Sequence, residues 1–498
     1  MPHFDITGGT ALHGAVRVSG SKNAALPIMA AAILATEPVR LERVPRLADV
    51  RTQALLLRCL GLRVTVEKGE TGGADILVCQ GSGNPVDRSA DKNVCPTALD
   101  EDVCPTALDD GVCPTVSAKD VCSTLLLETI DPAPVRAREE LVRRMRAGFC
   151  VLGPLLARRG RAVVPLPGGC NIGVRPVDLH LNGLAALGAD IRLDHGYVIA
   201  SARRLTGANV ELCGPCGPTV TGTANVMSAA VLARGTTTIR GAAIEPEIVD
   251  LGRFLAAMGA EIEGLGTSTI RIEGVEQLGG TSHRLIPDRI EAATLLIAAA
   301  ITRGSATIVG VVPKHLEAVL AKLVAAGAEI EIGPGSVSIV APRRLRAVDI
   351  VAEPYPSIPT DLQAQWTALA SVSEGVSRIE DHVFPSRFMH AAELNRLGAA
   401  IAVGQGTATV AGVERLSGAR VAACDLRASA ALVLAGLAAD GRTTVQHIHH
   451  LDRGYQHLDQ KLRQLGARIE RFTGGLLRSF PESKDRPAGV SCGTRSWP

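Results

Sequence analysis

The amino-acid sequence predicts an α/β protein with two domains, each built from three repeated units. The first observation is an internal repeat of the type Leu-Gly-Ala-x-Ile, whose glycines stand at positions 61, 188, 259, 327, 398 and 466. The second is their spacing, because all intervals but the first are close to the ~70 residues of a small α/β unit. The third is length, since 498 residues exceed what one hydrophobic core organises. A solenoid has shorter, uniform repeats, so we expect two domains.

Each unit is expected to contain strands, a helix that ends at the repeated glycine, and a buried apolar helix. The glycine suits the left-handed conformation that ends a helix, and the β-branched residue after it begins a strand. Short strands and alternating stretches are expected around the repeats at residues 236–240, 306–309, 336–340, 407–410 and 443–446. Three apolar runs, each shorter than the ~20 residues of a membrane span, predict helices buried on all sides: residues 24–35, 292–301 and 428–439.

The composition excludes several classes of partner. A net charge of +2, from 52 basic and 50 acidic side chains, provides no basis for nucleic-acid binding. The absence of a long apolar segment speaks against a membrane protein, and the first residues lack the features of a signal peptide. We therefore expect a cytoplasmic protein in which most of the twelve cysteines are reduced.

The first repeat interval, from Gly61 to Gly188, exceeds the others by about 57 residues. An insertion at residues 85–134 accounts for much of this excess, because a Val-Cys-Pro-Thr pattern recurs there every nine residues. Its cysteines, at 95, 104, 113 and 122, invite a metal site, but zinc-binding cysteines usually pair two to four residues apart. A repetitive, disordered surface loop is favoured. The segment 473–498 is expected to be a disordered tail.

A second cysteine pair lies in Cys213-Gly-Pro-Cys216. A pair with this spacing can form a reactive disulfide. The aromatic residue that precedes a thioredoxin motif is missing here. A turn between a strand and a helix at 219–233 is therefore favoured over a redox site.

The segment Leu166–His180 is the strongest candidate for the site of chemistry. Its glycines and prolines are incompatible with a regular helix or strand, and they surround Cys170. A guanidinium at Arg175 suits phosphate or carboxylate, while Asp178 offers acceptors for hydroxyl groups. From these residues alone, a surface turn with an inert cysteine is an equally good interpretation.

Eight motifs, which occur in one order between about residue 4 and residue 472, carry a resemblance to a known family. They are Ser-Gly-Ser-Lys-Asn-Ala-Ala-Leu at 19–26, the cysteine loop with Arg-Pro-Val-Asp-Leu-His at 175–180, Glu-Pro-Glu-Ile-Val-Asp at 245–250, Leu-Ile-Pro-Asp-Arg-Ile at 285–290, Pro-Thr-Asp-Leu-Gln at 359–363, Arg-Phe-Met-His at 387–390, Asp-Leu-Arg-Ala-Ser at 425–429 and Asp-Arg-Gly-Tyr at 452–455. Together they resemble the UDP-N-acetylglucosamine enolpyruvyl transferases.

The resemblance implies the enolpyruvyl transferase fold: two inverted α/β-barrel domains, each of three units, with the substrates in the cleft between them. One domain would span residues 20–286, and the other would combine residues 1–19 with 287–472. The implied reaction moves the enolpyruvyl group of phosphoenolpyruvate to the 3′-hydroxyl of UDP-N-acetylglucosamine and releases phosphate. This is the first committed step of peptidoglycan synthesis. It needs an acid, a base and cations, but no cofactor and no metal.

The resemblance also implies roles for individual residues. Cys170 matches the proposed general acid, which is the target of the epoxide antibiotic fosfomycin, and Asp361 matches the proposed acceptor of the sugar hydroxyl proton. The cations that match the phosphoenolpyruvate site are Lys22, Arg175, Arg427 and Arg453. The positions that match contacts to the UDP-sugar are Asn23, Arg146, Arg175, Pro176, Val177, Asp178, Leu179, Thr219, Val220, Thr221 and Val383.

Two alternative functions stay open at this point. Enzymes that act on shikimate 3-phosphate share the implied fold but lack the loop with Cys170. A catalytically silent relative that binds a UDP-sugar is disfavoured by the presence of Lys22, Cys170, Asp361 and Arg453, whereas the long insertion favours it weakly.

Overall fold

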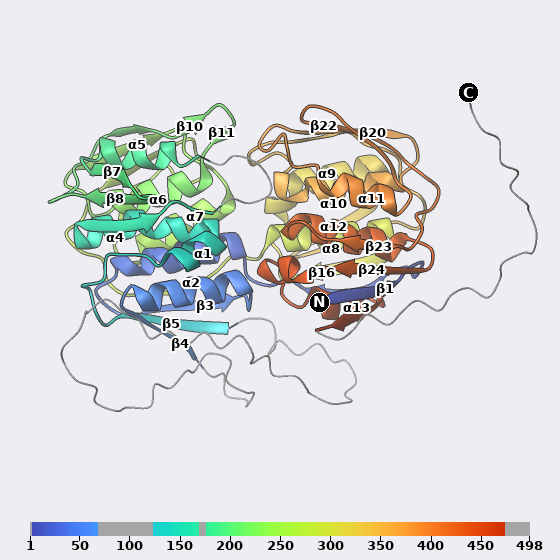
Figure 1. The fold of residues 1–498 in the computed structure, drawn as a ribbon, viewed down its shortest axis with the longest axis horizontal. Coiled ribbons are helices and arrows are strands. Elements are labelled where there is room, and N and C mark those ends of the chain that lie inside the picture. The colour runs from blue at the N-terminus through green and yellow to red at the C-terminus, as the bar shows by residue number, and fades with distance from the viewer. Residues whose placement is uncertain (1, 68–122, 169–175, 474–498) are drawn as a thin grey trace, which may run out of the picture.

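The structure is a computed structural model that describes residues 2–67, 123–168 and 176–473. The elements form two rounded halves that lie side by side (Figure 1). The buried apolar side chains form two clusters that follow this arrangement. One contains residues between 24 and 285, and the other combines residues 4–18 with residues 290–469. The chain thus begins in the second half, builds the first half and then returns.

Three sheets of the first half have the strand orders β15-β3-β5-β4, β6-β8-β7 and β13-β14-β12-β9, and β10 pairs with β11 in a small hairpin. Their strands are β3 (Val39–Val44), β4 (Leu62–Glu67), β5 (Ser123–Thr129), β6 (Arg161–Pro165), β7 (Asp190–Asp194), β8 (Tyr197–Ser201), β9 (Asn209–Glu211), β10 (Cys213–Gly214), β11 (Gly217–Pro218), β12 (Thr236–Arg240), β13 (Glu261–Glu263), β14 (Thr269–Glu273) and β15 (Ser282–Arg284).

Three sheets of the second half have the strand orders β17-β18-β16-β2, β19-β20-β22-β21 and β23-β24-β1-β25. Their strands are β1 (His3–Thr7), β2 (His13–Arg17), β16 (Ser305–Val309), β17 (Glu329–Gly333), β18 (Ser336–Val340), β19 (Ile350–Ala352), β20 (Val376–Asp381), β21 (Ala400–Val403), β22 (Thr407–Ala411), β23 (Arg420–Ala422), β24 (Arg442–Gln446) and β25 (Arg468–Phe472). Each half therefore has three such sheets, in agreement with three repeated units.

The helices of the first half are α1 (Lys22–Ala31), η1 (Ala32–Leu34), α2 (Ala48–Cys59), α3 (Glu139–Arg144), η2 (Arg146–Val151), α4 (Leu152–Arg159), α5 (Asp178–Ala186), α6 (Val220–Ala230) and α7 (Pro246–Ala257). Those of the second half are α8 (Arg289–Ile301), η3 (Pro313–Leu316), α9 (Glu317–Ala326), η4 (Thr360–Leu362), α10 (Gln363–Ser371), α11 (His390–Arg396), α12 (Leu426–Ala438), η5 (Ile448–Arg453) and α13 (Leu458–Gln464).

Helices occupy the centre of each half and sheets cover them, as the second half shows most clearly. Every residue of α8 and α10 is buried, and these two helices contact α12 and each other. Strands such as β18 and β22 instead alternate between buried residues and residues that are partly or fully exposed. Sheets with one face on the core and one toward solvent follow from this alternation. The predicted α/β fold class is confirmed.

The repeat pattern predicted the ends of six helices correctly. Glycines 61, 188, 259, 327, 398 and 466 all have positive φ, between 83° and 109°, and each follows one of the helices α2, α5, α7, α9, α11 and α13. A side chain would be strained in this conformation. The strands expected at 236–240 and 336–340 coincide with β12 and β18, and β16, β22 and β24 each extend one residue beyond the expected bounds. The three apolar runs form α1 with η1, α8 and α12.

Several expectations fall wholly or partly outside the described residues. They concern the tail 473–498, the nine-residue repeats with cysteines 95, 104, 113 and 122, and most of the expected insertion. Its last part is described: Ser123–Thr129 forms strand β5, which pairs with β3 and β4 rather than forming a loop. The predicted turn at Cys213–Cys216 is the β10–β11 hairpin directly before α6. Among the described helices, none has the length and apolar character needed to cross a membrane.

The two chain segments that connect the halves lie against each other. Gly20 forms an isolated antiparallel bridge with Pro287. The carboxylate of Asp288 caps α8 by accepting hydrogen bonds from the backbone N–H groups of Ile290 and Glu291, each at 2.9 Å. Its second oxygen accepts the N–H of Lys22 at 3.1 Å, which fixes the start of α1 beside the start of α8.

Candidate active site

Lys22 lies at the first position of α1, at the junction of the two halves. Ser21 caps the helix by accepting a hydrogen bond from the N–H of Ala24 at 3.3 Å. Lys22 Nζ lies 3.4 Å from one carboxylate oxygen of Asp49 in α2, and Arg453 Nε of η5 donates to the other at 2.9 Å. Asp49 therefore pairs with one cation from each half and holds them close together.

Asp361 is the centre of a second ion cluster. It lies in η4, and its two carboxylate oxygens accept hydrogen bonds from two different guanidinium groups, Arg387 Nη1 at 3.0 Å and Arg427 Nη2 at 2.7 Å. Both arginines are buried, with side chains only 6% and 2% exposed. Although burial opposes its charge, Arg427 and Arg387 hold the pKa of Asp361 well below its ordinary value. The carboxylate is therefore ionised at neutral pH.

The two clusters form one electrostatic unit. Burial lowers the pKa of Lys22, and Arg427 and Arg453 act in the same direction, while Asp49 and Asp361 oppose them. The unit has four cations, Lys22, Arg387, Arg427 and Arg453, but two carboxylates, Asp49 and Asp361. Cations gathered in this way beside the boundary between the halves favour binding of a phosphate or carboxylate, although Asp288 and Asp381 also lie close enough to interact with Arg427 and Arg387.

A buried hydrogen-bond network holds Tyr455, whose ring packs against Arg427. The guanidinium carbon lies 5.2 Å from the centre of the Tyr455 ring. The hydroxyl of Tyr455 lies 3.0 Å from Thr294 Oγ1 and accepts a hydrogen bond from Gln365 Nε2 at 2.9 Å. Asp361 also raises the pKa of Arg427, although burial opposes this. Arg427 is thus held directly by Asp361 of η4 and by Tyr455, whose hydroxyl is in turn held by residues of α8 and α10.

The positions expected to contact a nucleotide sugar lie around the starts of α5 and α6. Arg146 Nη2 donates to the backbone oxygen of Pro176 at 3.0 Å, directly before α5. Thr219 caps α6, and the hydroxyl of Thr221 lies 3.2 Å from His180 Nε2. Asn225 Nδ2, also in α6, lies 2.9 Å from the other ring nitrogen of that histidine. The remaining positions in this group are exposed or half-buried: Val177, Asp178, Leu179 and Val220.

Two further expected positions lie close to the ion clusters. Asn23 is half-buried and follows Lys22 in the first turn of α1. The N–H of Val383 donates to Asp381 at 3.0 Å, and the same carboxylate accepts the hydroxyl of Thr360 at 2.6 Å, next to Asp361. Asn23 is therefore next to Lys22 in the chain, and Val383 is linked to Thr360, the neighbour of Asp361, through the carboxylate of Asp381.

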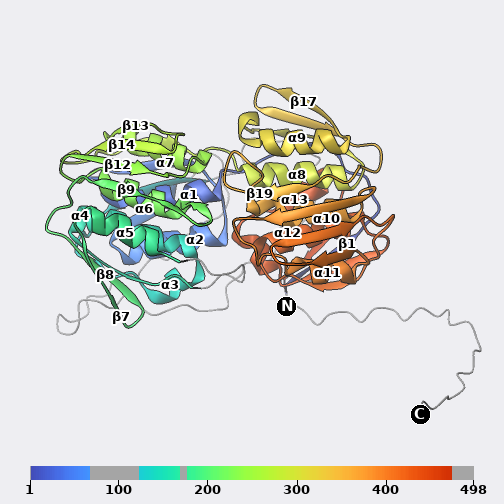
Figure 2. The same ribbon diagram turned by 90° about the horizontal axis from the view of Figure 1, so that it is seen from above.

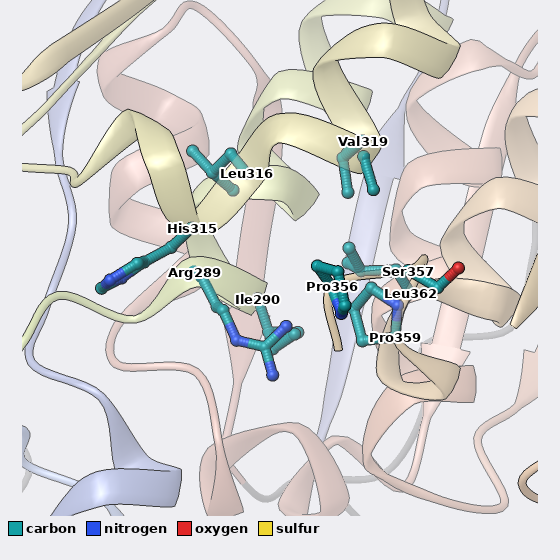
Figure 3. A pocket seen from close by; sticks show the side chains of 10 residues that line it. Arg289, Ile290, His315, Leu316, Val319, Pro356, Ser357, Pro359 and Leu362 are labelled. Carbon is teal, nitrogen blue, oxygen red and sulfur yellow. The ribbon is translucent and has the colours of Figure 1, made fainter. Parts of the chain in front are cut away.

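A small cavity beside η4 is too small for a substrate. Its volume is about 10 Å³, close to the space of one water molecule. Figure 3 shows its walls, which include Arg289, Leu316, Val319 and Leu362. Substrate binding is therefore better sought at the exposed edge of the ion clusters than in this cavity.

The structure brings together four of the residues proposed from the sequence. Lys22, Asp361, Arg427 and Arg453 converge, whereas Cys170 and Arg175 lie outside the described residues. The sequence analysis missed three contributors. Arg387 and Tyr455 stand inside motifs that were recognised, so both were detectable, whereas the role of Asp49 depends on contacts with distant segments. In the part of the chain that the structure describes, no group of three or more His, Cys, Asp or Glu side chains is arranged to hold a metal ion.

Comparisons with known proteins agree with this geometry. The family model of EPSP synthase (3-phosphoshikimate 1-carboxyvinyltransferase) matches residues 6–85 and 126–462, and thus leaves out most of the expected insertion. A protein from Gloeobacter violaceus named UDP-N-acetylglucosamine 1-carboxyvinyltransferase is 47% identical over 97% of this chain and 92% of its own. A protein from Carboxydothermus hydrogenoformans, named UDP-N-acetylglucosamine 1-carboxyvinyltransferase 2, is 46% identical over 95% of this chain and 100% of its own.

Solved structures show the same fold. The enolpyruvyl transferase NikO from Streptomyces tendae superposes with a TM-score of 0.75 at 25% identity, covering 95% of this chain and 99% of its own. EPSP synthase from Acinetobacter baumannii superposes with a TM-score of 0.64 at 16% identity, covering 95% of this chain and 100% of its own. The chain therefore belongs to the EPSP synthase family of enolpyruvyl transferases, and within it to the UDP-N-acetylglucosamine 1-carboxyvinyltransferases.

Proposed function

We propose that this enzyme transfers the enolpyruvyl group of phosphoenolpyruvate to the 3′-hydroxyl of UDP-N-acetylglucosamine and releases phosphate, which is the first committed step of peptidoglycan synthesis. The observation that carries the proposal is the ion cluster at the junction of the halves, with Lys22, Arg427 and Arg453 around Asp361 and Asp49. A cluster in which Arg427 is buried and Lys22 and Arg453 are half-buried suits phosphoenolpyruvate, which carries a phosphate and a carboxylate. The names of the near-full-length relatives favour the UDP-sugar over shikimate 3-phosphate as acceptor.

The chemistry requires one proton to be donated and another to be accepted. The sugar oxygen forms a bond to C2 of phosphoenolpyruvate while C3 gains a proton, and the sugar hydroxyl loses its own proton. The resulting tetrahedral intermediate then breaks its bond to the phosphate oxygen and loses a proton from C3. We assign the acid to Cys170 and the acceptor of the hydroxyl proton to Asp361, as the resemblance implies. Lys22, Arg175, Arg427 and Arg453 would hold the anionic groups.

The ion pairs of Asp361 with Arg387 and Arg427 suggest how substrate binding could turn this carboxylate into a base. With both oxygens bound to guanidinium groups, its pKa is too low for efficient proton transfer. A substrate anion that binds Arg427 would share that guanidinium and compensate part of its charge. The pKa of Asp361 would then rise toward the range in which it accepts a proton.

The residues around α5 and α6 are assigned to the nucleotide sugar. Their position at two helix starts suits a diphosphate. The residues assigned to the nucleotide sugar there are Arg146, Pro176, Val177, Asp178, Leu179, Thr219, Val220 and Thr221, and Asn23 and Val383 beside the ion clusters are assigned to it as well.

We further propose that the two apolar clusters are separate domains, formed by residues 20–286 and by residues 1–19 with 287–472. We place the enzyme in the cytoplasm. Among the described residues, Cys150, Cys213 and Cys216 form no disulfide, which is consistent with a reducing compartment.

The direct test is phosphate release from phosphoenolpyruvate with UDP-N-acetylglucosamine, with shikimate 3-phosphate or with no acceptor. We expect release only with the UDP-sugar. Equal release with shikimate 3-phosphate would contradict the proposed acceptor. No release from folded protein, together with binding of the UDP-sugar, would instead identify a silent relative.

The role of Cys170 has its own test. The variant Cys170→Asp should retain measurable turnover, because a carboxylic acid can also donate a proton, but it should lose covalent capture by fosfomycin. Mass spectrometry of the treated protein measures the capture. Cys213→Ser, which changes an exposed cysteine elsewhere, is the matched control and should be labelled like the wild type. Labelling of Cys170→Asp at the wild-type level would refute the assignment.

A further inference from the structure

A basic pocket of about 360 Å³ lies in the first half, at the end of α4. Four arginines line it, two from each of two segments, together with a single carboxylate, Glu276. Helix α4 lies on the side of the first half that faces away from the second half (Figures 1 and 2). None of the residues assigned above to catalysis or to substrate binding lines this pocket.

The local fold brings two Arg-Arg pairs together from distant parts of the chain. Gly160 ends α4 with a φ of 68°, and its backbone oxygen accepts the N–H of Ala202 at 2.9 Å. This bond continues the antiparallel pairing of β6 with β8 by one residue. Arg158-Arg159 comes directly before Gly160, and Arg203-Arg204 comes directly after Ala202. The two arginine pairs therefore lie next to the same backbone hydrogen bond.

The charge of the pocket is poorly compensated. Arg204 pairs with Glu276 at 2.6 Å, and both side chains are largely exposed. In the described residues, no carboxylate lies within ion-pair distance of Arg158 or Arg203. Cations at the end of a helix are favoured by the helix dipole, which accounts for Arg158 and Arg159 but not for the second pair.

Arg159 adds to the positive charge of the pocket wall. One of its terminal nitrogens donates to the backbone oxygen of Pro134. Its Nε and Nη2 atoms are buried and have no hydrogen-bond partner in the described part of the chain. Burial lowers the pKa of this guanidinium, and Arg158 acts in the same direction, whereas Asp131 opposes the shift. The Nε and Nη2 donors are closed off from the pocket, so the guanidinium of Arg159 contributes positive charge to the pocket wall rather than hydrogen bonds to a ligand.

We propose that this pocket binds a soluble organic phosphate with two or more negative charges. Guanidinium groups bind phosphate through paired hydrogen bonds, and the exposed Arg158, Arg203 and Arg204 can together engage two phosphate groups. The volume lies in the range of small-molecule sites. The walls also include Leu232, a half-buried apolar side chain that suits the organic part of such a ligand. A recessed pocket with these walls fits a small molecule better than a flat membrane surface. The proposal is independent of the proposed catalytic function.

Isothermal titration calorimetry with pyrophosphate tests the proposal on the full chain. The variant Arg158→Glu/Arg203→Glu changes two exposed side chains of the pocket. We expect it to bind one equivalent less than the wild type, or to bind that equivalent at least about 100-fold more weakly. Inorganic phosphate, with one phosphate group, should bind more weakly than pyrophosphate to the wild type.

The matched control is Arg378→Glu/Arg415→Glu, which makes the same change in net charge on exposed side chains of the second half. It should bind pyrophosphate like the wild type. Thermal unfolding of all three proteins checks that they are folded. Equal pyrophosphate stoichiometry and affinity in the wild type and the pocket variant would overturn the proposal. Loss of binding to phosphatidylglycerol vesicles in the pocket variant, with pyrophosphate binding unchanged, would also overturn it and identify a lipid site.

Discussion

Replacing Asp361 with asparagine should lower kcat by a factor on the order of 10²–10⁴, the range that a positioned base contributes. The amide keeps the size of the side chain but cannot take up the hydroxyl proton of the sugar. It also removes the negative charge between Arg387 and Arg427, whose nitrogens lie 3.0 and 2.7 Å from the carboxylate oxygens. Steady-state phosphate release measures the effect, with KM for both substrates determined alongside kcat.

The control for this variant is Asp440→Asn, which changes an exposed carboxylate paired with Arg415. It should leave kcat unchanged, because a surface ion pair contributes little. A role as base predicts a loss mainly in kcat, whereas a purely positioning role predicts a rise in KM for phosphoenolpyruvate. If folded Asp361→Asn keeps kcat within tenfold of the wild type, Asp361 is not the base.

Replacing Lys22 with methionine should lower kcat/KM for phosphoenolpyruvate by a factor on the order of 10²–10³, because it removes a buried cation from an anion site. Its Nζ lies 3.4 Å from Asp49, and its side chain is 11% exposed. Burial lowers the pKa of Lys22 below the ordinary 10.5, so the wild type should lose kcat/KM as the pH rises through that lowered pKa. The part of the alkaline loss that comes from Lys22 should be absent from Lys22→Met, whereas any part that comes from ionisation of the Cys170 thiol should remain.

Two further variants define the result for Lys22. Lys22→Arg keeps a cation that does not titrate in this range, so it should also lack that part of the alkaline loss while retaining more activity than Lys22→Met. Lys314→Met removes an exposed lysine of η3 and should behave like the wild type. An unchanged alkaline limb in Lys22→Met would show that another group titrates there.

The repeat architecture was predictable because it depends on local chemistry. A glycine that ends a helix needs positive φ wherever it occurs, so the six glycines mark six helix ends without knowledge of the fold. Continuous apolar runs such as Ala292–Ile301 indicate burial on all sides, and α8 is buried throughout. The expected insertion was placed less well: β-pairing of Ser123–Thr129 with β3 and β4 is a long-range contact that the nine-residue repeat pattern concealed.

In the active site, too, some residues could be predicted from the sequence and others could not. Motifs with a family resemblance identified Lys22, Asp361, Arg427 and Arg453 from the sequence alone. The partner of two of them, Asp49, stands in a segment without any distinguishing pattern.

By itself, the sequence determined the fold class, the repeated units and the residue types available for the chemistry, because helix ends and apolar periodicity are read within a few residues. Only the tertiary structure decided how these residues are charged and paired. Asp49 joins cations more than 400 positions apart in the chain, Lys22 and Arg453, and Arg158-Arg159 meets Arg203-Arg204 through one backbone hydrogen bond. The pKa and binding capacity of such groups depend on burial and on neighbours a few ångströms away, and those neighbours are set by packing rather than by sequence position.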